Sequence, residues 1–234
     1  MQKVIYSQDR GETSIDWLQS HHSFSFGNYY DPRNMGFGPL RVINEDYVAP
    51  GTGFGMHGHA NMEIITYVLS GQLEHKDNLG NGSQITPGDV QVMSAGKGIM
   101  HSEFNPSGTA PVHLLQIWIM PEETGTAPGY QQKTFEAGEL ENALRLVVSP
   151  DKADGSLAIR QQARLWIGRL DQEKSVSLEI DKSKKYWFQV ARGNVSIRGE
   201  VLGAGDALAV DGEAGLAEIS ASSAAELVVF ELPH

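Results

Sequence analysis

The chain has 234 residues, of which 40% are hydrophobic and 20% are charged, a composition typical of a globular protein with a buried core. Its formal net charge of -11 argues against direct binding to nucleic acid or to an anionic membrane, because both require a basic patch. It has no cysteine, no apolar leader in MQKVIYSQDRGETS and no apolar stretch of the roughly 18 residues that span a membrane, so we expect a cytoplasmic protein without disulfides or thiolate metal ligands.

Short runs with the composition of β-strands follow one another along the chain, and helical periodicity is nearly absent. In chain order, the predicted strands are 40–43, 62–69, 72–76, 90–93, 99–104, 112–119, 144–148, 165–170, 176–180, 186–190, 195–197, 207–210 and 227–232. Turn sequences such as Pro87-Gly88-Asp89 separate them, since proline presets a turn and glycine permits positive φ. This pattern predicts an all-β fold, either a sandwich or a barrel.

The two halves of the chain resemble each other. VLSGQLE (68–74) and TPGDVQV (86–92) in the first half are similar to VARGNVS (190–196) and GAGDALAV (203–210) in the second. We therefore predict two tandem β-barrels, 1–130 and 131–234, which meet in the stretch 121–138 that is rich in glycine and proline. Seven of the eight histidines lie at or before His113, so only the first barrel is expected to hold a histidine metal site.

Four residues form two pairs of candidate ligands, His57 with His59 and His101 with Glu103. Residues i and i+2 of a strand share a face, so two such pairs on neighbouring strands would direct three imidazoles and one carboxylate at one point. This donor set predicts one divalent transition-metal ion, and without thiolates iron, nickel, manganese, cobalt or copper suits it better than a structural zinc. Of these ions we take iron as the first choice. Open coordination positions would indicate catalysis or sensing rather than a structural role.

The segments around these residues resemble a known family. GTGFGMHGHANMEIITYVLSG (51–71) and AGKGIMHSEFN (95–105) are similar to the two sequence motifs of the cupins. With FSFGNYYDP (24–32), MGFGPLRVINED (35–46), SAGKGIMHSE (94–103) and QIWIMPE (116–122), they make the chain similar to the pirin-like bicupins, including the bacterial quercetin 2,3-dioxygenases. The resemblance covers essentially the whole chain and implies two tandem cupin barrels of jelly-roll type.

The choice of carboxylate ligand depends on strand register. In most cupins the ligand glutamate precedes a glycine by seven residues, but counting back from Gly71 reaches Ile64 rather than Glu63. A shift of one residue turns a strand side chain to the other face. The pirin-like H-x-E pair instead implies Glu103 as the ligand, with Glu63 and Asn105 behind the ligands. A β-bulge between His59 and Glu63 would return Glu63 to the site, and that alternative stays open.

The histidines outside the two motifs have no comparable support. We expect core or surface positions for His75 and His113, and positions beside a pocket entrance for His21 and His22.

The resemblance implies a reaction, which is O2-dependent cleavage of the heterocycle of flavonols such as quercetin with loss of carbon monoxide. Glu103 would accept or relay the proton of the substrate's 3-hydroxyl. Phe24, Phe26, Phe37 and Phe54 would line a pocket for the planar flavonol, with packing in the core as the alternative for each. The alternative function is a non-enzymatic, metal-binding redox sensor or transcriptional co-regulator of the pirin type, which would bind a protein partner rather than DNA.

Overall fold

A computed structural model describes residues 1–234 and confirms the predicted all-β fold. The chain forms two compact units. The N-terminal unit comprises Arg10–Thr134 and Leu157–Gln161, and the C-terminal unit comprises Met1–Asp9, Phe135–Ser156 and Gln162–His234. The sequence therefore does not divide into two consecutive segments, since the first nine residues belong to the C-terminal unit.

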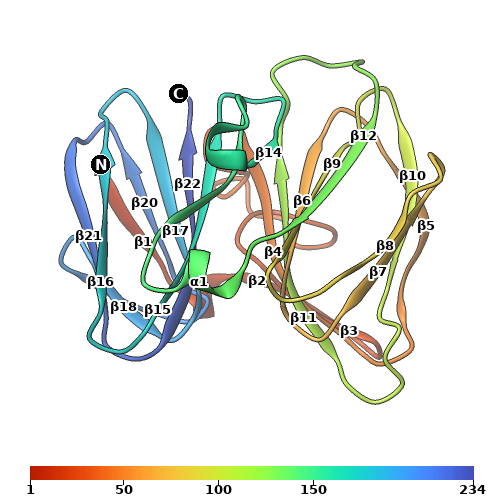
Figure 1. Ribbon diagram of the computed structural model, residues 1–234, viewed down its shortest axis with the longest axis horizontal. Helices are drawn as coiled ribbons and strands as arrows, with labels where there is room; N and C mark the ends of the chain where they lie inside the picture. The colour runs from red at the N-terminus through yellow and green to blue at the C-terminus, as the bar shows by residue number, and fades with distance from the viewer. The chain divides into compact units, whose positions relative to one another are not determined.

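The N-terminal unit contains two antiparallel sheets (Figure 1). The larger sheet has the order β12-β9-β6-β11-β4-β3-β2 and the smaller one the order β5-β10-β7-β8. The strands are β2 (Gly11–Ile15), β3 (Leu18–His22), β4 (Leu40–Val48), β5 (Gly53–His59), β6 (Glu63–Ser70), β7 (Leu73–Asp77), β8 (Gly82–Ile85), β9 (Asp89–Ser94), β10 (Ile99–Phe104), β11 (Val112–Ile119) and β12 (Gly129–Thr134), followed by the short β14 (Leu157–Ala158).

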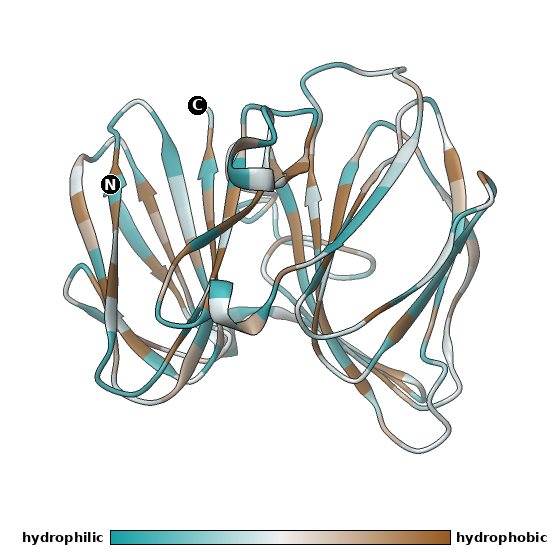
Figure 2. Cartoon of the chain, viewed as in Figure 1, coloured by the Kyte–Doolittle hydropathy of each residue, from teal (hydrophilic) through white to brown (hydrophobic).

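The inner faces of these two sheets pack against each other at one end of the unit. Val68 and Leu114 of the larger sheet share an apolar cluster with Leu73 and Ile85 of the smaller one. Apolar and polar residues alternate along many strands, as the brown and teal segments of Figure 2 show. Toward the other end the inward positions of β4, β5 and β10 carry polar side chains instead, and this departure from an apolar core locates the candidate site.

The C-terminal unit repeats the arrangement. Its larger sheet includes, in order, β1-β20-β17-β22-β15-β13, and its smaller sheet has the order β16-β21-β18-β19. The strands are β1 (Gln2–Ile5), β13 (Arg145–Ser149), β15 (Arg164–Leu170), β16 (Ser175–Ile180), β17 (Lys185–Arg192), β18 (Asn194–Ile197), β19 (Glu200–Gly203), β20 (Ala207–Asp211), β21 (Gly215–Ala221) and β22 (Ala225–Leu232). The helical elements are short, namely η1 (Ser7–Asp9), α1 (Ala137–Leu140) and η2 (Ala153–Gly155).

Equivalent turns confirm the internal repeat. Gly71, between β6 and β7, has φ 78°, and Gly193, between β17 and β18, has φ 74°. At both positions a Cβ would lie less than 3 Å from a neighbouring backbone carbonyl, 2.7 Å from Pro111 O and 2.1 Å from Ala224 O. Only glycine fits such a turn without strain. The prediction of two tandem jelly-roll-like barrels is thus confirmed. No helix has the length and apolar character needed to cross a membrane.

Candidate metal centre

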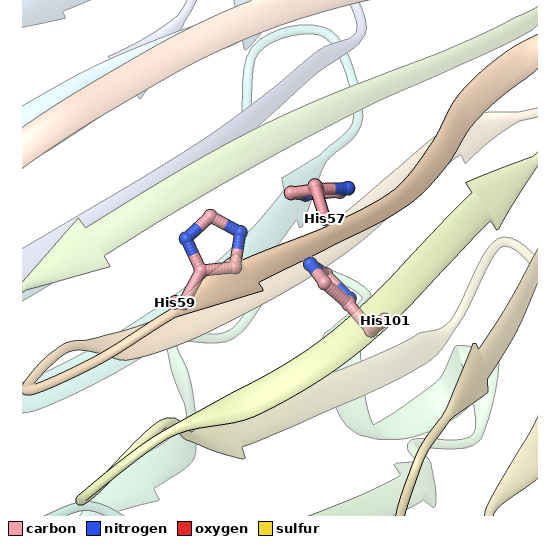
Figure 3. Close-up of side chains that lie close together, drawn as sticks. All are labelled: His57, His59 and His101. Atoms are coloured by element: carbon pink, nitrogen blue, oxygen red, sulfur yellow. The ribbon is translucent and has the colours of Figure 1, made fainter.

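Three of the four predicted ligands meet on the smaller sheet of the N-terminal unit. β5 and β10 pair antiparallel with His57 opposite His101, and His59 lies two residues further along β5. Figure 3 shows the three imidazole rings converging from these two neighbouring strands. One nitrogen from each ring can be chosen so that all three lie within 4.8 Å of one another. These distances are suited to a single ion that binds all three imidazoles.

Hydrogen bonds indicate which ring nitrogens are available to bind an ion. Nδ1 of His57 lies 2.8 Å from the carbonyl oxygen of Gly55, and because that oxygen can only accept, Nδ1 must donate. The lone pair of His57 is therefore on Nε2. Nε2 of His101 is buried and has no hydrogen-bond partner, which would cost about 1–3 kcal/mol if it stayed unsatisfied. A bound transition-metal ion would satisfy it, so the residues present fit the predicted ion.

The electrostatics of the cluster favour neutral imidazoles. Burial lowers the pKa of His59 to about 4 and that of His101 to about 3, and repulsion from His57 lowers both further. Neutral imidazole is the form that binds metal, so ion binding at His59 and His101 near neutral pH requires no loss of a proton from these rings.

Glu103 lies on the same inward face of β10 as His101 and is 3% exposed, but it is not part of the three-histidine group. Nε2 of Gln116 donates to its carboxylate, at 2.9 Å from each oxygen. Burial raises the pKa of Glu103 to about 7. Glu103 and His101 thus share the inward face of β10, as their i, i+2 spacing predicts. The carboxylate of Glu103 is hydrogen-bonded to Gln116 of the larger sheet.

Glu63 and Asn105 are both buried, at the ends of two strands. The carboxylate of Glu63 accepts hydrogen bonds from Oγ of Ser94 at 2.8 Å and from the backbone N–H of Arg160 at 3.2 Å. Nδ2 of Asn105 donates to the carbonyl oxygens of Val48 and Ala110 at 3.0 and 2.9 Å. Glu63 thus anchors the segment at residue 160, and Asn105 fixes the loop after β10.

A cavity of about 360 Å³ opens beside the histidines. Of the four predicted pocket phenylalanines, Phe26 and Phe54 line it. Phe24 and Phe37 do not line it. Phe24 is 2% exposed within the core, and Phe37 forms an isolated β-bridge with Leu40.

Sequence reasoning missed Trp118, which also lines the cavity. Its ring meets His59 edge-on at 4.8 Å and Phe26 edge-on at 5.4 Å between centroids. Its Nε1 is buried without a partner. The residue lies within the correctly predicted strand 112–119, where a tryptophan among apolar residues gives no local sign of a functional position.

Polar side chains form the cavity wall on the larger sheet, in rows that follow the strand register. Gln116 is opposite Thr66 on one side and opposite Asn44 on the other, and Asn44 is in turn opposite His22. Nδ1 of His22 lies 2.8 Å from Oδ1 of Asn44. In the next row Asp46, whose Oδ1 is buried without a partner, is opposite a serine of β3.

The comparisons with known proteins agree with this geometry. A family model described as pirin matches residues 4–119, and one described as the quercetinase C-terminal cupin domain matches residues 146–232. The chain is 47% identical over 227 residues to a protein named quercetin 2,3-dioxygenase from Escherichia coli strain K12, covering 97% of this chain and 96% of that one. It is 42% identical over 225 residues to a pirin-like protein of Caulobacter vibrioides, covering 94% and 95%. The crystal structure of the bacterial pirin YhhW from Escherichia coli in complex with nickel(II) matches with a TM-score of 0.94 at 45% identity, covering 100% of this chain and 99% of that one.

Proposed function

The chain belongs to the pirin family, and on that premise we propose that it is a metal-dependent dioxygenase that cleaves the heterocycle of flavonols such as quercetin with O2 and releases carbon monoxide. The observation that carries the proposal is the cluster of three imidazoles at the wall of a partly aromatic cavity, with the buried Nε2 of His101 unsatisfied. The name of the 47% identical relative supports the same reaction class.

We assign the ion to His57, His59 and His101, with Glu103 as the fourth ligand. Sequence alone favours iron, but the nickel(II) complex of YhhW makes nickel the first ion to test. Bound here, the ion would act as a Lewis acid on the 3-hydroxyl of the flavonol. Three neutral imidazoles and one carboxylate leave a divalent site with one net positive charge, which favours an anionic ligand such as a flavonolate.

Glu103 is the group that we assign to the proton of the 3-hydroxyl. It lines the cavity and points inward from the same strand as His101. Gln116, which also lines the cavity, donates to both carboxylate oxygens, so the carboxylate is held at the cavity wall before a substrate enters. A preoriented proton acceptor within reach of the substrate typically contributes about 10²- to 10⁴-fold in rate.

The aromatic residues fit a planar substrate. Phe26, Phe54 and Trp118 line the same cavity as the histidines. Aromatic rings bind flat ligands by offset stacking or edge contacts, and the polar wall formed by Asn44 and Gln116 offers hydrogen bonds to ring hydroxyls. The cytoplasmic location and the absence of a nucleic-acid partner stay predictions from composition.

The test follows the ultraviolet-visible absorbance of quercetin together with carbon monoxide release, using protein loaded with nickel or iron and checked by elemental analysis. We expect multiple turnovers for the wild type and at least a 10²-fold lower turnover for Glu103→Gln. Glu63→Gln tests the alternative carboxylate and should retain activity, as should the surface control Glu74→Gln.

Two results would contradict the proposal. Unchanged turnover in Glu103→Gln would remove its role as proton acceptor. An absorbance change that stops after one equivalent of quercetin, without carbon monoxide, would reject the enzyme and support the metal-binding sensor or co-regulator instead.

A further inference from the structure

His75 lies directly behind His101, although nothing in the motifs marks it. It is on β7, which pairs with β10 so that Asp77 is opposite His101 and His75 is opposite Glu103. Nε2 of His75 lies 3.2 Å from Oδ2 of Asp77, and Nδ1 of His75 lies 3.4 Å from Nδ1 of His101. Both side chains of the His75–Asp77 pair are 0% exposed. Asp77, His75 and His101 therefore form a continuous, buried hydrogen-bonded relay that ends at a proposed metal ligand.

The chemistry of each partner fixes where the protons in this relay lie. An ionised carboxylate can only accept, so Nε2 of His75 carries the proton that it donates to Asp77. A neutral imidazole has one N–H, which leaves Nδ1 of His75 as an acceptor. The contact with His101 then requires His101 to donate from Nδ1. Its remaining lone pair is consequently on Nε2, the atom that is buried without any partner in the protein.

Asp77 is itself held rigidly by the turn that follows β7. The backbone N–H groups of Leu79 and Asn81 donate to its Oδ1 at 2.9 and 3.0 Å, and Nδ2 of Asn81 donates to its Oδ2 at 2.9 Å. The ring of Tyr130 stacks on His75, with 4.7 Å between centroids and an interplanar angle of 25°. His75 is therefore confined between Tyr130 and His101, whose ring centroid lies 5.2 Å away.

We propose that Asp77 and His75 are positioning residues that select the metal-binding tautomer of His101 and hold its ring toward the ion. The inference rests on the metal site of the proposed function, but not on the flavonol as substrate. Partners that fix a ligand histidine in this way typically contribute 10- to 100-fold to metal affinity. The relay does not serve His57, because Nδ1 of His57 donates its proton to the carbonyl oxygen of Gly55 instead.

The experiment measures nickel(II) affinity by competition with a chelator, and histidine tautomers by ¹⁵N NMR of the metal-free protein. In the wild type we expect the proton of His101 on Nδ1. His75→Phe keeps the stacking on Tyr130 but removes the acceptor, so we expect nickel affinity to fall 10- to 100-fold and the proton of His101 to shift toward Nε2. His75→Gln returns an acceptor oxygen and should recover part of the affinity.

Asp77→Asn provides a second route to the same outcome. The amide of the new side chain can donate to His75 and so reverse the direction of the hydrogen bonds in the relay. We therefore expect weaker nickel binding although the His75 ring is still present. His21→Phe serves as the matched control, because His21 has no contact with the relay, and its nickel affinity should equal that of the wild type.

Two findings would overturn the relay. One is an Nε2–H tautomer of His101 in the metal-free wild type, and the other is a nickel affinity for His75→Phe within twofold of the wild-type value. Neither measurement uses a flavonol, so failure of quercetin turnover would refute the proposed reaction and leave the relay intact. A purely structural role of His75 would lower stability without changing the tautomer.

Discussion

Glu45 is a buried carboxylate that the candidate metal centre does not use. Oε2 accepts a hydrogen bond from Nη1 of Arg10 at 2.7 Å, and Oε1 lies 2.8 Å from Nε2 of His113. Burial by itself would raise the pKa of Glu45, but the hydrogen bond with His113 and the charge of Arg10 outweigh it and lower the pKa to about 2. The sequence-based expectation of a core or surface position for His113 omitted this pairing, which joins β11 to β4.

We predict that Glu45→Gln destabilises the protein in a pH-dependent way. A carboxylate whose folded pKa is below the unfolded value stabilises fully above the unfolded pKa, here about 4.5, and this stabilisation is lost as the pH falls toward about 2. The difference corresponds to roughly 3 kcal/mol at pH 7. Denaturant unfolding should therefore show a constant deficit from pH 7 to 5 that shrinks below pH 4.5.

The matched control is Glu12→Gln, an exposed carboxylate on β2, which should change stability by less than about 0.5 kcal/mol at every pH. A deficit for Glu45→Gln that stays constant down to pH 3 would show that packing, rather than charge pairing, explains the loss.

At this scale the sequence located the three histidines because i, i+2 spacing on a strand is visible in the chain itself. The partners of those histidines were not visible. Gln116 is on β11 and His75 is on β7. Both strands pair with strands that are distant in the sequence, and no local sequence pattern indicates these pairings. His75 and Asp77 have the same i, i+2 spacing as the ligands, yet only the register with β10 shows that they lie behind His101.

At the scale of elements, β5 shows why strand prediction was incomplete. The predicted strands 99–104 and 112–119 coincide with β10 and β11, whereas β5 was not among the predicted strands. Its sequence GFGMHGH has three glycines and no β-branched residue, so its intrinsic strand propensity is low. Pairing with β10 imposes the conformation. β3 (LQSHH) and β12 (GYQQKT) are also absent from the predicted strands, because most of their residues are polar.

A β-bulge in β5 also shapes the cavity. His57 is opposite His101, but Phe54 is opposite Glu103, so three residue steps on β5 match two on β10. The extra residue brings Phe54 onto the same face as His57, and both line the cavity. Regular alternation of side chains along β5 would have placed Gly55 on that face instead. No pattern of side chains in the sequence reveals this bulge.

We predict that Gly53→Ala weakens both folding and metal binding. A Cβ at Gly53 would lie 2.2 Å from the carbonyl oxygen of Glu103 and 2.6 Å from Cα of Phe104, so β5 must move away from β10. The cost should be roughly 1–3 kcal/mol of unfolding free energy. Because this pairing also sets the separation of His57 and His101, nickel affinity should fall about tenfold or more, measured by chelator competition.

Gly55→Ala is the control on the same strand. A Cβ there meets no atom within 4 Å, so the variant should be as stable as the wild type or slightly more stable, with unchanged nickel affinity. Equal behaviour of the two variants would mean that close approach of the backbones does not determine the ligand geometry.

At the scale of the whole molecule, the two units share one topology but have different interiors. The sheet β16-β21-β18-β19 corresponds strand for strand to β5-β10-β7-β8. Where His57 is opposite His101, the second unit has apolar pairs such as Leu178 opposite Ala217 and Val176 opposite Ile219. These residues belong to, or pack against, a continuous apolar cluster. In the second barrel, apolar core side chains therefore occupy the position that corresponds to the candidate metal site of the first barrel.

The edge strands of the two larger sheets also correspond, since β12 pairs with β9 and β1 pairs with β20. The sequence repeat identified β9 and β20 through their Gly-Asp turns, but it gave no sign that the first residues of the chain complete the second barrel. Val4 packs against the apolar cluster of the C-terminal unit and is opposite Leu208. The N–H of Ser7 donates to Oδ1 of Asp206 at 2.7 Å and fixes the end of this segment.

We predict that removing residues 1–9 destabilises the C-terminal unit and leaves the metal site intact. Without β1, the outer backbone groups of β20 lose their partners, so hydrogen exchange of peptides covering 207–211 should accelerate. Exchange of peptides covering β9, residues 89–94, should not change, because β12 still pairs with it. Nickel affinity should equal that of the full chain, because all three histidines lie in the N-terminal unit.

Two point variants keep this prediction testable if the shortened chain does not fold. Val4→Asp places a charge against the apolar cluster and should reproduce the faster exchange of β20, with a loss of roughly 2 kcal/mol from the removed valine burial. Lys3→Gln changes an exposed side chain of the same strand and should have no effect. Unchanged protection of β20 in the truncated chain and in Val4→Asp would show that the second barrel closes without β1. Weaker nickel binding in either variant would instead show that the stability of the second barrel affects the metal site.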